Sequence, residues 1–402
     1  MDTKRILLAY SGGLDTTYCL VYLSKVLGLE VHALTINTGG FEQQELNQLK
    51  TRALAAGAKS FTVLDVRNRY YESCIKYLIF GNVLKNGNYP LSVSSERTIQ
   101  AIEIAVHAKE NGFTAIAHGS TGAGNDQVRF DMLIAHVYPT VQIITPIRDL
   151  QLSRQEELDF LHVHGFHENF AKANYSINKG LWGTSIGGQE TLQSHTHIPE
   201  SAWPVAVTKE IPLELAIHFK NGEPIALNDQ KFDHPVQLII HLQQIAQGYG
   251  IGRDLHVGDT IIGIKGRVAF EAAAPILLIH AHRLLEKHVL TKWQLFWKQQ
   301  LSEWYGNWMH EGHMLDPVMR DIEALLSSSQ HNVTGTVYAC LYPYRFVLNG
   351  ISSQHDLMNA KFGSYGEMNE TWTAADVKGF TKIVGNQTSI YYNINSTPIE
   401  EN

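Results

Sequence analysis

The sequence predicts an α/β protein in which an N-terminal, doubly wound parallel sheet is followed by a C-terminal α+β domain. The first observation is that short apolar runs, beginning with residues 5–10, alternate with helical periodicity up to residue 146. Such alternation is typical of βαβ units that build a parallel sheet. The second observation is that this alternation stops near residue 170, after which strand and helix patterns follow a different order.

The elements of the first domain follow from continuous apolar runs for strands and from 3.6-residue periodicity for helices. Strands are expected at residues 5–10, 30–37, 60–65, 113–118 and 140–146, and helices at about 15–27, 42–57, 67–79 and 95–110. In the second domain, Asn221-Gly222 lies between two strand-like runs and predicts a hairpin over residues 211–228. The remaining expected elements are a helix at 234–247, a largely helical region at 276–328 and strands within 333–351. The predicted domains are 1–170 and 171–375, with a tail at 376–402 that shows no clear pattern.

Net charge and cysteine usage narrow the functional classes. The chain has 402 residues, with 32 Lys and Arg against 39 Asp and Glu, which gives a net charge of -7 and argues against a nucleic acid as its main partner. Cys19, Cys74 and Cys340 are widely spaced, which argues against a disulfide framework and a cysteine zinc site. No apolar run is long enough to span a membrane, and the first residues do not resemble a signal peptide. We therefore expect a soluble, cytoplasmic enzyme without membrane association.

The histidines do not indicate a metal site, although there are 20 of them. The segment His310-Glu311-Gly312-His313 has the wrong spacing for the H-E-x-x-H zinc motif, and no cysteine partners lie near the other histidine pairs. We predict that the protein holds no structural metal of its own.

The sharpest local signal is the loop S-G-G-L-D-T-T at residues 11–17, between a buried strand and a helix. Its glycines allow close backbone approach, and the start of the helix presents free N–H groups to an anion. The hydroxyls of Ser11, Thr16 and Thr17 add donors, and the Asp15 carboxylate is an oxygen ligand that suits Mg²⁺. The spacing is neither that of a Walker A loop nor that of G-x-G-x-x-G. An ordinary capped strand-to-helix turn is the alternative.

The S-G-G-x-D-[ST] pattern resembles the PP-loop of the N-type ATP pyrophosphatases. This resemblance implies that the loop grips the β and γ phosphates of ATP. The α phosphorus is then open to a substrate oxygen, and pyrophosphate is a stabilised leaving group.

A second signal follows the strand expected at 113–118, where residues 118–131 read H-G-S-T-G-A-G-N-D-Q-V-R-F-D. Ligands of open α/β sheets bind at this carboxyl edge. Asn125 and Arg129 are four residues apart on the expected helix and share one face. Arg129 can clamp a carboxylate and Asp126 can accept from an ammonium group, which together suit an amino-acid zwitterion. A Gly-rich turn before a capped helix is the alternative.

Together with residues 9–17, this G-x-T-G-x-G-N-D-Q-V-R-F segment resembles the argininosuccinate synthase family. A third element agrees, because Tyr175-Ser176-Ile177-Asn178, followed by Leu181-Trp182 and Ser185, resembles the family's Y-S-x-D/N-x-x-L-W/M-x-x-S stretch. The three motifs occur in order and cover most of the first domain and the start of the second.

The resemblance implies a ligase of arginine biosynthesis that joins citrulline and aspartate, using ATP and Mg²⁺ and releasing AMP and pyrophosphate. It implies that 1–170 is the ATP-binding domain, that 171–375 is the synthetase and oligomerisation domain, and that the protein is a homotetramer. The aromatic stretch from Trp293 to Trp308 fits a subunit contact or a buried helix pair.

The family's pattern also assigns site residues, although we nominate no general base because the sequence supplies no convincing one. The ATP contacts would be Ala9, Tyr10, Ser11, Gly12, Gly13, Leu14, Asp15, Thr16, Thr17, Ile36, Gly119 and Gly122. The aspartate contacts would be Thr121, Asn125 and Asp126. The citrulline contacts would be Tyr89, Ser94, Asn125, Arg129, Ser176 and Ser185.

Some positions depart from the family's pattern. Ala123 stands where many members carry Lys, and Gly258 and Phe270 match the positions of a citrulline-binding Glu and Tyr. Either this branch binds citrulline through other residues, such as Asp259 or Glu271, which we favour, or its acceptor differs. The alternatives are therefore another PP-loop adenylating enzyme with a different acceptor and a non-catalytic ATP-binding relative.

Overall fold

The computed structural model describes residues 5–122, 124–167, 175–359, 365–367 and 371–395. The chain divides into a large unit, Met1–His355, and a small one, Asp356–Asn402. Within the described residues, no helix is both long and apolar enough to cross a membrane.

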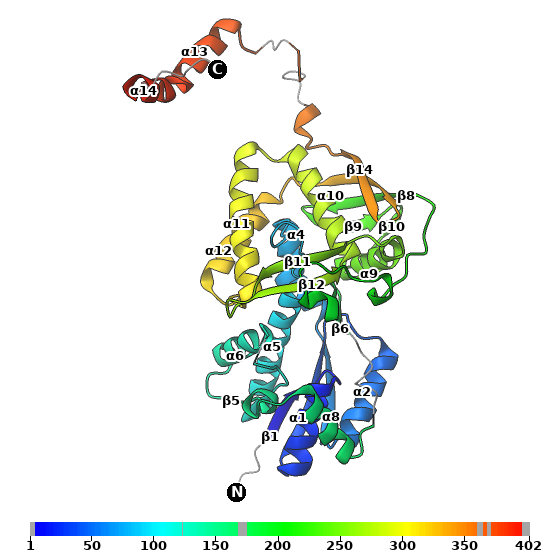
Figure 1. Cartoon of the computed structure of the whole chain (residues 1–402). Coiled ribbons are helices and arrows are strands. Elements are labelled where there is room, and N and C mark those ends of the chain that lie inside the picture. The colour runs from blue at the N-terminus through cyan, green and yellow to red at the C-terminus, as the bar shows by residue number, and fades with distance from the viewer. Residues whose placement is uncertain (1–4, 123, 168–174, 360–364, 368–370, 396–402) are drawn as a thin grey trace. The chain divides into compact units, whose positions relative to one another are not determined.

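The N-terminal part of the large unit, which begins in blue in Figure 1, is built around a parallel sheet. Its strand order is β3-β2-β1-β4-β5, and all of its strand pairs are parallel. Its strands are β1 (Arg5–Ala9), β2 (Glu30–Asn37), β3 (Ser60–Asp65), β4 (Ala115–Ala117) and β5 (Gln142–Ile144). The predicted parallel, doubly wound class is confirmed. The expected strands at 113–118 and 140–146 are present but shorter, with three residues each. Because the chain moves from β1 outward to β3 and then returns to β4, the order switches between β1 and β4, where such sheets bind ligands.

Helices cover both faces of this sheet, as the continuous burial of Ile6, Leu7 and Leu8 in β1 requires. Ile6 and Leu8 belong to one apolar cluster with α1, α2 and α8, whereas Leu7 belongs to another with α5. These helices are α1 (Leu14–Val21, continued by a π-helical turn Tyr22–Val26), α2 (Gln43–Ala55), α5 (Ser92–Glu110) and α8 (Arg154–Val163). The segment expected as one helix at 67–79 is α3 (Arg67–Tyr70), a π-helical turn (Tyr71–Ile75) and α4 (Lys76–Phe80), and α6 (Asp126–Val137) and α7 (Pro146–Asp149) follow later.

The C-terminal part of the large unit contains two antiparallel sheets. One has the order β10-β9-β8-β13-β14 and includes the predicted hairpin and the predicted strand pair near 333–351. Its strands are β8 (Leu213–Lys220), β9 (Glu223–Leu227), β10 (Gln230–Lys231), β13 (Gly335–Tyr342) and β14 (Arg345–Ser352). The expected helical regions are α9 (Pro235–Ala246), α10 (Ala273–Val289), α11 (Lys292–Glu311) and α12 (Pro317–Ser329).

The other sheet, of order β11-β12-β7-β6, was not predicted from the sequence. Its strands are β6 (Tyr175–Gly180), β7 (Gly183–Gly188), β11 (Arg253–Asp259) and β12 (Lys265–Glu271). They are rich in glycine and polar residues and lack a clear apolar alternation. This sheet carries much of the candidate site described below.

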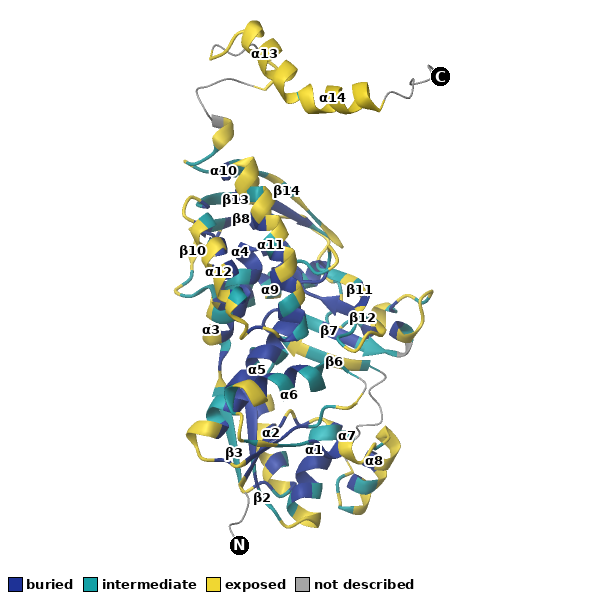
Figure 2. Cartoon of the chain, turned by 90° about the vertical axis from the view of Figure 1, so that its left-hand side faces the viewer, coloured by how far each residue is buried: buried dark blue, intermediate teal, exposed yellow. Residues whose placement is uncertain are grey.

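One apolar core joins the two parts of the large unit (Figure 2). Tyr70, Ile75 and Leu78, which follow β3, are fully buried in the same cluster as Leu238 of α9 and Leu277 of α10. The segment from α3 to α4 therefore anchors the C-terminal helices to the parallel sheet.

The small unit contains α13 (Ala374–Val384) and α14 (Asn386–Ile394), which lie almost entirely in the tail at 376–402 that shows no clear sequence pattern. Neither helix has a buried residue.

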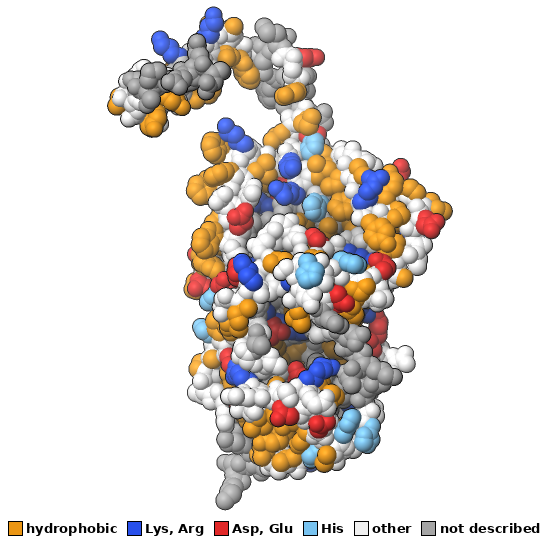
Figure 3. Space-filling view, in the orientation of Figure 1, with side chains coloured by type: hydrophobic (Ala, Val, Ile, Leu, Met, Phe, Trp, Pro, Cys, Tyr) orange, Lys and Arg blue, Asp and Glu red, His pale blue; other side chains and the backbone are white. Residues whose placement is uncertain are grey.

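On the face of the molecule that Figure 3 shows, acidic and basic side chains are interspersed.

Candidate active site

The loop after β1 forms an open helix start. Gly12 has φ +74° and Gly13 is extended with φ -75°, so that the chain turns sharply before α1 begins at Leu14. Arg52 of α2 fixes this turn, because its Nη1 donates to the Gly12 carbonyl at 2.9 Å. The start of α1 has no side-chain cap. Its N–H groups therefore lie at the carboxyl edge of the sheet, where an anion can accept from them.

The Gly-rich turn after β4 packs directly on this helix start. A Cβ atom at Gly119 would lie 3.1 Å from Asp15 Cβ and 3.2 Å from the Thr16 nitrogen, so only glycine fits without displacement. Ile36, from the end of β2, is buried close to the same edge. The structure therefore brings the predicted ATP residues from β1, β2 and β4 to one edge. Ala123 lies outside the described residues.

Two carboxyl groups meet beneath the loop, and the sequence analysis missed one of them. Asp15 forms a side-chain hydrogen bond with Glu157 of α8, which is 3% exposed. Burial, reinforced by the charge of Asp15, raises the pKa of Glu157 to about 8. Burial also raises the pKa of Asp15. Such a pair retains a proton near neutral pH and would lose it to solvent when a cation binds nearby.

At the start of α6, Asp126 joins two arginines. Its Oδ1 accepts from Arg129 Nη1 at 2.7 Å, and its Oδ2 accepts from Arg97 Nε at 3.3 Å. Arg129 is 3% exposed, and its Nε also donates to the His310 carbonyl of α11 at 2.8 Å. Asn125 is held by the tip of the β11–β12 hairpin, where the Ile261 nitrogen donates to its Oδ1 at 2.8 Å. These contacts join elements far apart in the sequence around one polar cluster.

The unpredicted sheet directs one face toward this cluster. In an antiparallel sheet, directly paired residues share a face, and so do alternate residues of one strand. Ser185 pairs with Asn178 on one side and with Phe270 on the other. This face therefore carries Ser176, Asn178, Ser185, Phe270, Asp254, His256 and Gly258.

The N-terminal end of α5 covers that face. Arg97 Nη2 donates to Asn178 Oδ1 at 2.7 Å, and Trp182 Nε1 donates to the Pro90 carbonyl at 2.9 Å. The Tyr89 ring stacks on His256 at 4.8 Å between ring centroids and contacts Phe270 at 5.4 Å. Of the predicted citrulline residues, Tyr89, Ser94, Arg129 and Ser185 are buried here, whereas Ser176 is exposed.

Sequence reasoning missed three residues of this region. Arg97 links α5, α6 and β6, and its position one helical turn after Ser94 was the only available signal. His256 and His310 are buried, and burial lowers the pKa of His256 to about 4 and that of His310 to about 3. No local pattern relates these histidines to Tyr89 or Arg129, from which they are far removed in sequence.

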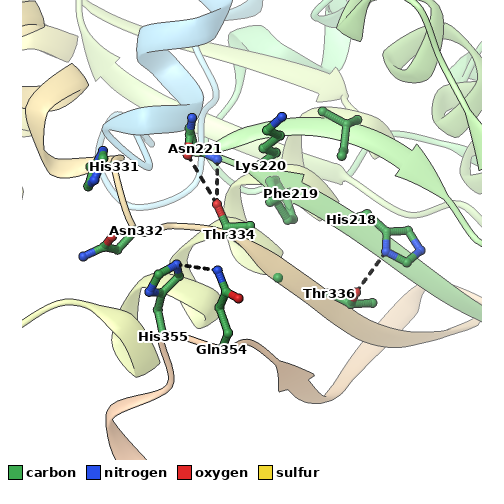
Figure 4. Close-up of a pocket in the computed structure, with 12 residues that line it drawn as sticks. His218, Phe219, Lys220, Asn221, His331, Asn332, Thr334, Thr336, Gln354 and His355 are labelled. Atoms are coloured by element: carbon green, nitrogen blue, oxygen red, sulfur yellow. Dashed lines mark hydrogen bonds between the residues drawn. The ribbon is translucent and has the colours of Figure 1, made fainter.

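Asp259 and Glu271, which the sequence analysis offered as alternative citrulline-binding residues, already have ion-pair partners. Asp259 Oδ1 forms an ion pair with Lys265 Nζ at 2.7 Å near the hairpin tip. Glu271 Oε2 forms one with Arg253 Nε at 3.1 Å and is 2% exposed. A separate cavity of about 480 Å³ lies beside β8 and β13 and includes His218, Thr336 and His355, but none of its lining residues is a predicted site residue (Figure 4).

Comparison with known proteins identifies the family. The arginosuccinate synthase N-terminal HUP domain matches residues 5–167, and the arginosuccinate synthase C-terminal domain matches residues 175–391. The chain belongs to the argininosuccinate synthase family. This family comprises ATP-using ligases of arginine biosynthesis, and the protein is accordingly a ligase.

Argininosuccinate synthases from several bacteria match nearly the whole chain. The protein from Xanthomonas campestris pv. campestris is 36% identical, over 98% of this chain and 100% of its own length. The proteins from Xylella fastidiosa and Dictyoglomus turgidum are each 34% identical, over 98% and 97% of this chain and 99% and 98% of their own lengths. Matches across both parts favour this family over other PP-loop enzymes.

Proposed function

We propose that this protein ligates citrulline and aspartate to argininosuccinate, with ATP converted to AMP and pyrophosphate. The observation that carries this proposal is the packing of Gly119 on Asp15 and Thr16. It supports the proposal that an anion binds at the start of α1, close to the turn that leads into the cluster of Arg97, Asp126 and Arg129. A phosphate and two amino acids can therefore meet at one edge of the sheet.

In the first step, the ureido oxygen of citrulline attacks the α phosphorus, an O–P bond forms and the bond to pyrophosphate breaks. This citrullyl-adenylate has AMP as a leaving group. In the second step, the α-amine of aspartate attacks the ureido carbon and loses a proton as AMP departs. Holding three reactants in line supplies much of the rate enhancement, and we assign no general base.

The loop from Ala9 to Thr17 would hold the phosphates of ATP, while Ile36 and the 117–125 turn would contact the rest of the nucleotide. Asp15 and Glu157 fit a Mg²⁺ ion, because two carboxylates with raised pKa values become good oxygen ligands when a cation displaces their protons. When bound, the ion would neutralise charge on the phosphates. Its remaining ligands would come from phosphate and water.

The amino acids would lie between the 117–125 turn and the sheet face that carries Ser185. Thr121, Asn125 and Asp126 would bind aspartate, and Tyr89, Ser94, Asn125, Arg129, Ser176 and Ser185 would bind citrulline. Asn125 is assigned to both substrates, and a residue that contacts both would hold them close enough to react with each other.

We also propose that 1–170 is the ATP-binding domain, that 171–375 forms the synthetase and oligomerisation domain, and that the protein is a cytoplasmic homotetramer. The exposed aromatic side chains of α11, Trp293, Trp297 and Trp304, support a subunit contact because large apolar groups seldom remain in water. Light scattering tests the assembly, and a monomeric mass would refute it.

Pyrophosphate release tests the reaction, using ATP, Mg²⁺, aspartate and citrulline together and with each omitted in turn. We expect release that requires citrulline, and argininosuccinate identified by mass. ATP binding without any citrulline-dependent release would refute the proposal.

A further inference from the structure

His256 lies against Tyr89 and Gly258, in the part of the candidate site where citrulline, the ureido acceptor, would bind. A Cβ atom built on Gly258 would lie 2.6 Å from His256 Nε2 and 3.1 Å from its Cε1. Since a Cβ atom cannot approach that closely, the imidazole occupies the room that a side chain at position 258 would need. The observed position of the His256 ring therefore requires glycine at position 258.

His256 is buried with hydrogen-bonding capacity unused. The side chain is 5% exposed, one ring face lies against Tyr89, and Nδ1 has no hydrogen-bond partner within the described residues. A buried nitrogen without a hydrogen-bond partner destabilises a folded protein unless a ligand or a water molecule supplies the missing hydrogen bond. Burial keeps the ring neutral, with a pKa of about 4, and the nearby Lys85 acts in the same direction.

Among the described residues, the acidic side chain on the same sheet face as His256 is Asp254, and it has a protein partner. Asp254 accepts from Asn88 Nδ2 at 2.8 Å, and Asp126 joins two arginines. Asp259 and Glu271 belong to the opposite face of this sheet and have the ion-pair partners described above. An ammonium group entering here would meet a neutral imidazole rather than a free carboxylate.

We propose that His256 binds the ureido acceptor at the end that carries the α carbon and its substituent, remote from the ureido group. This subsite does not require that substituent to be a free ammonium group. The ligands are ω-ureido carboxylic acids, including α-deaminated and α-N-acylated forms as well as citrulline. This inference rests on the proposed function. A neutral imidazole accepts from an ammonium or an amide N–H alike and, in its other tautomer, donates to a carbonyl oxygen. A carboxylate would instead favour the ammonium strongly.

Steady-state pyrophosphate release with saturating ATP, Mg²⁺ and aspartate tests the ligand class. Citrulline, 5-ureidopentanoate and Nα-acetylcitrulline are compared as acceptors. We expect kcat/KM for at least one of the two analogues to lie within about tenfold of that for citrulline, since no charge-assisted contact to the ammonium is lost. Turnover of citrulline with a larger deficit for both analogues would overturn the inference alone. Absence of citrulline turnover would instead refute the proposed function.

Two variants test the residue itself. His256→Phe keeps a ring against Tyr89 but removes both nitrogens, and His256→Asn restores a polar atom without the ring. We expect His256→Phe to raise KM for every accepted ureido acid about tenfold, the effect of one lost hydrogen bond, while kcat and the KM for ATP stay unchanged. His256→Asn should recover part of the loss. An unchanged acceptor KM in His256→Phe would show that the ring only packs, and would overturn the proposal.

Discussion

The two glycines of the loop after β1 should respond very differently to the same substitution. Gly12→Ala introduces a side chain at φ +74°, and its Cβ would lie 2.1 Å from Leu49 Cδ2. Gly13→Ala introduces the same methyl group at φ -75°, where the nearest atom outside the loop's immediate neighbours is Ser11 Oγ at 3.5 Å. Gly13→Ala is thus a matched control one residue away.

The cost at Gly12 has two sources. A left-handed backbone costs a residue with a Cβ atom about 1–2 kcal/mol. Leu49 is 6% exposed and packed in the core of α1 and α2, so moving it aside is overpacking, which costs about 1–3 kcal/mol. We expect Gly12→Ala to lose about 2–4 kcal/mol of unfolding free energy on these principles. Gly13→Ala should lose less than about 1 kcal/mol, because its backbone is already one that alanine adopts.

Urea unfolding followed by tryptophan fluorescence and circular dichroism measures the difference, and ATP titration of the folded variants measures its functional consequence. Gly12→Ala should unfold at clearly lower urea and bind ATP at least about tenfold more weakly, since a shift of ~1.4 kcal/mol suffices for that factor. Equal unfolding midpoints for the two variants would refute the steric argument.

Other contacts give further expectations. Arg97→Lys should lower kcat/KM about 10- to 100-fold, because an ammonium cannot reach both Asp126 and β6 as the guanidinium does; steady-state kinetics checks this. Lys298→Met should cost about 3–5 kcal/mol in urea unfolding, since it leaves the fully buried Glu286 without the ion pair at 2.8 Å. The pKa of His310 is about 3 against 6.5 for a free histidine, so between these values only the unfolded chain gains the proton and stability falls as the pH is lowered. The loss is about 1.4 kcal/mol per pH unit, and His310→Phe should reduce the difference in urea midpoint between neutral and mildly acidic solution.

The sequence alone determined the features that depend on neighbouring residues. An apolar run followed by S-G-G and a periodic segment can form only a buried strand, a tight turn and a helix start, so β1, the loop and α1 were predictable together. The βα alternation likewise predicted the parallel sheet, and Asn221-Gly222 predicted the hairpin of β8 and β9. The resemblance to the argininosuccinate synthase family rested on the same local motifs, which the full-length matches confirm.

Only the tertiary structure decided what surrounds those motifs. The strands β6, β7, β11 and β12 lack a distinct apolar alternation because one face mixes Phe270 with polar groups such as Asn178, which meets Arg97 of α5. The other face carries only a small apolar cluster around Ile186 and Ala269. Glu157 meets Asp15, and His256 meets Tyr89, across more than 140 residues of chain. Such contacts are determined by how whole helices and strands pack together, because each contact joins side chains that are far apart in the sequence. Their burial in turn sets the protonation of Glu157 and His256, which no local pattern specifies.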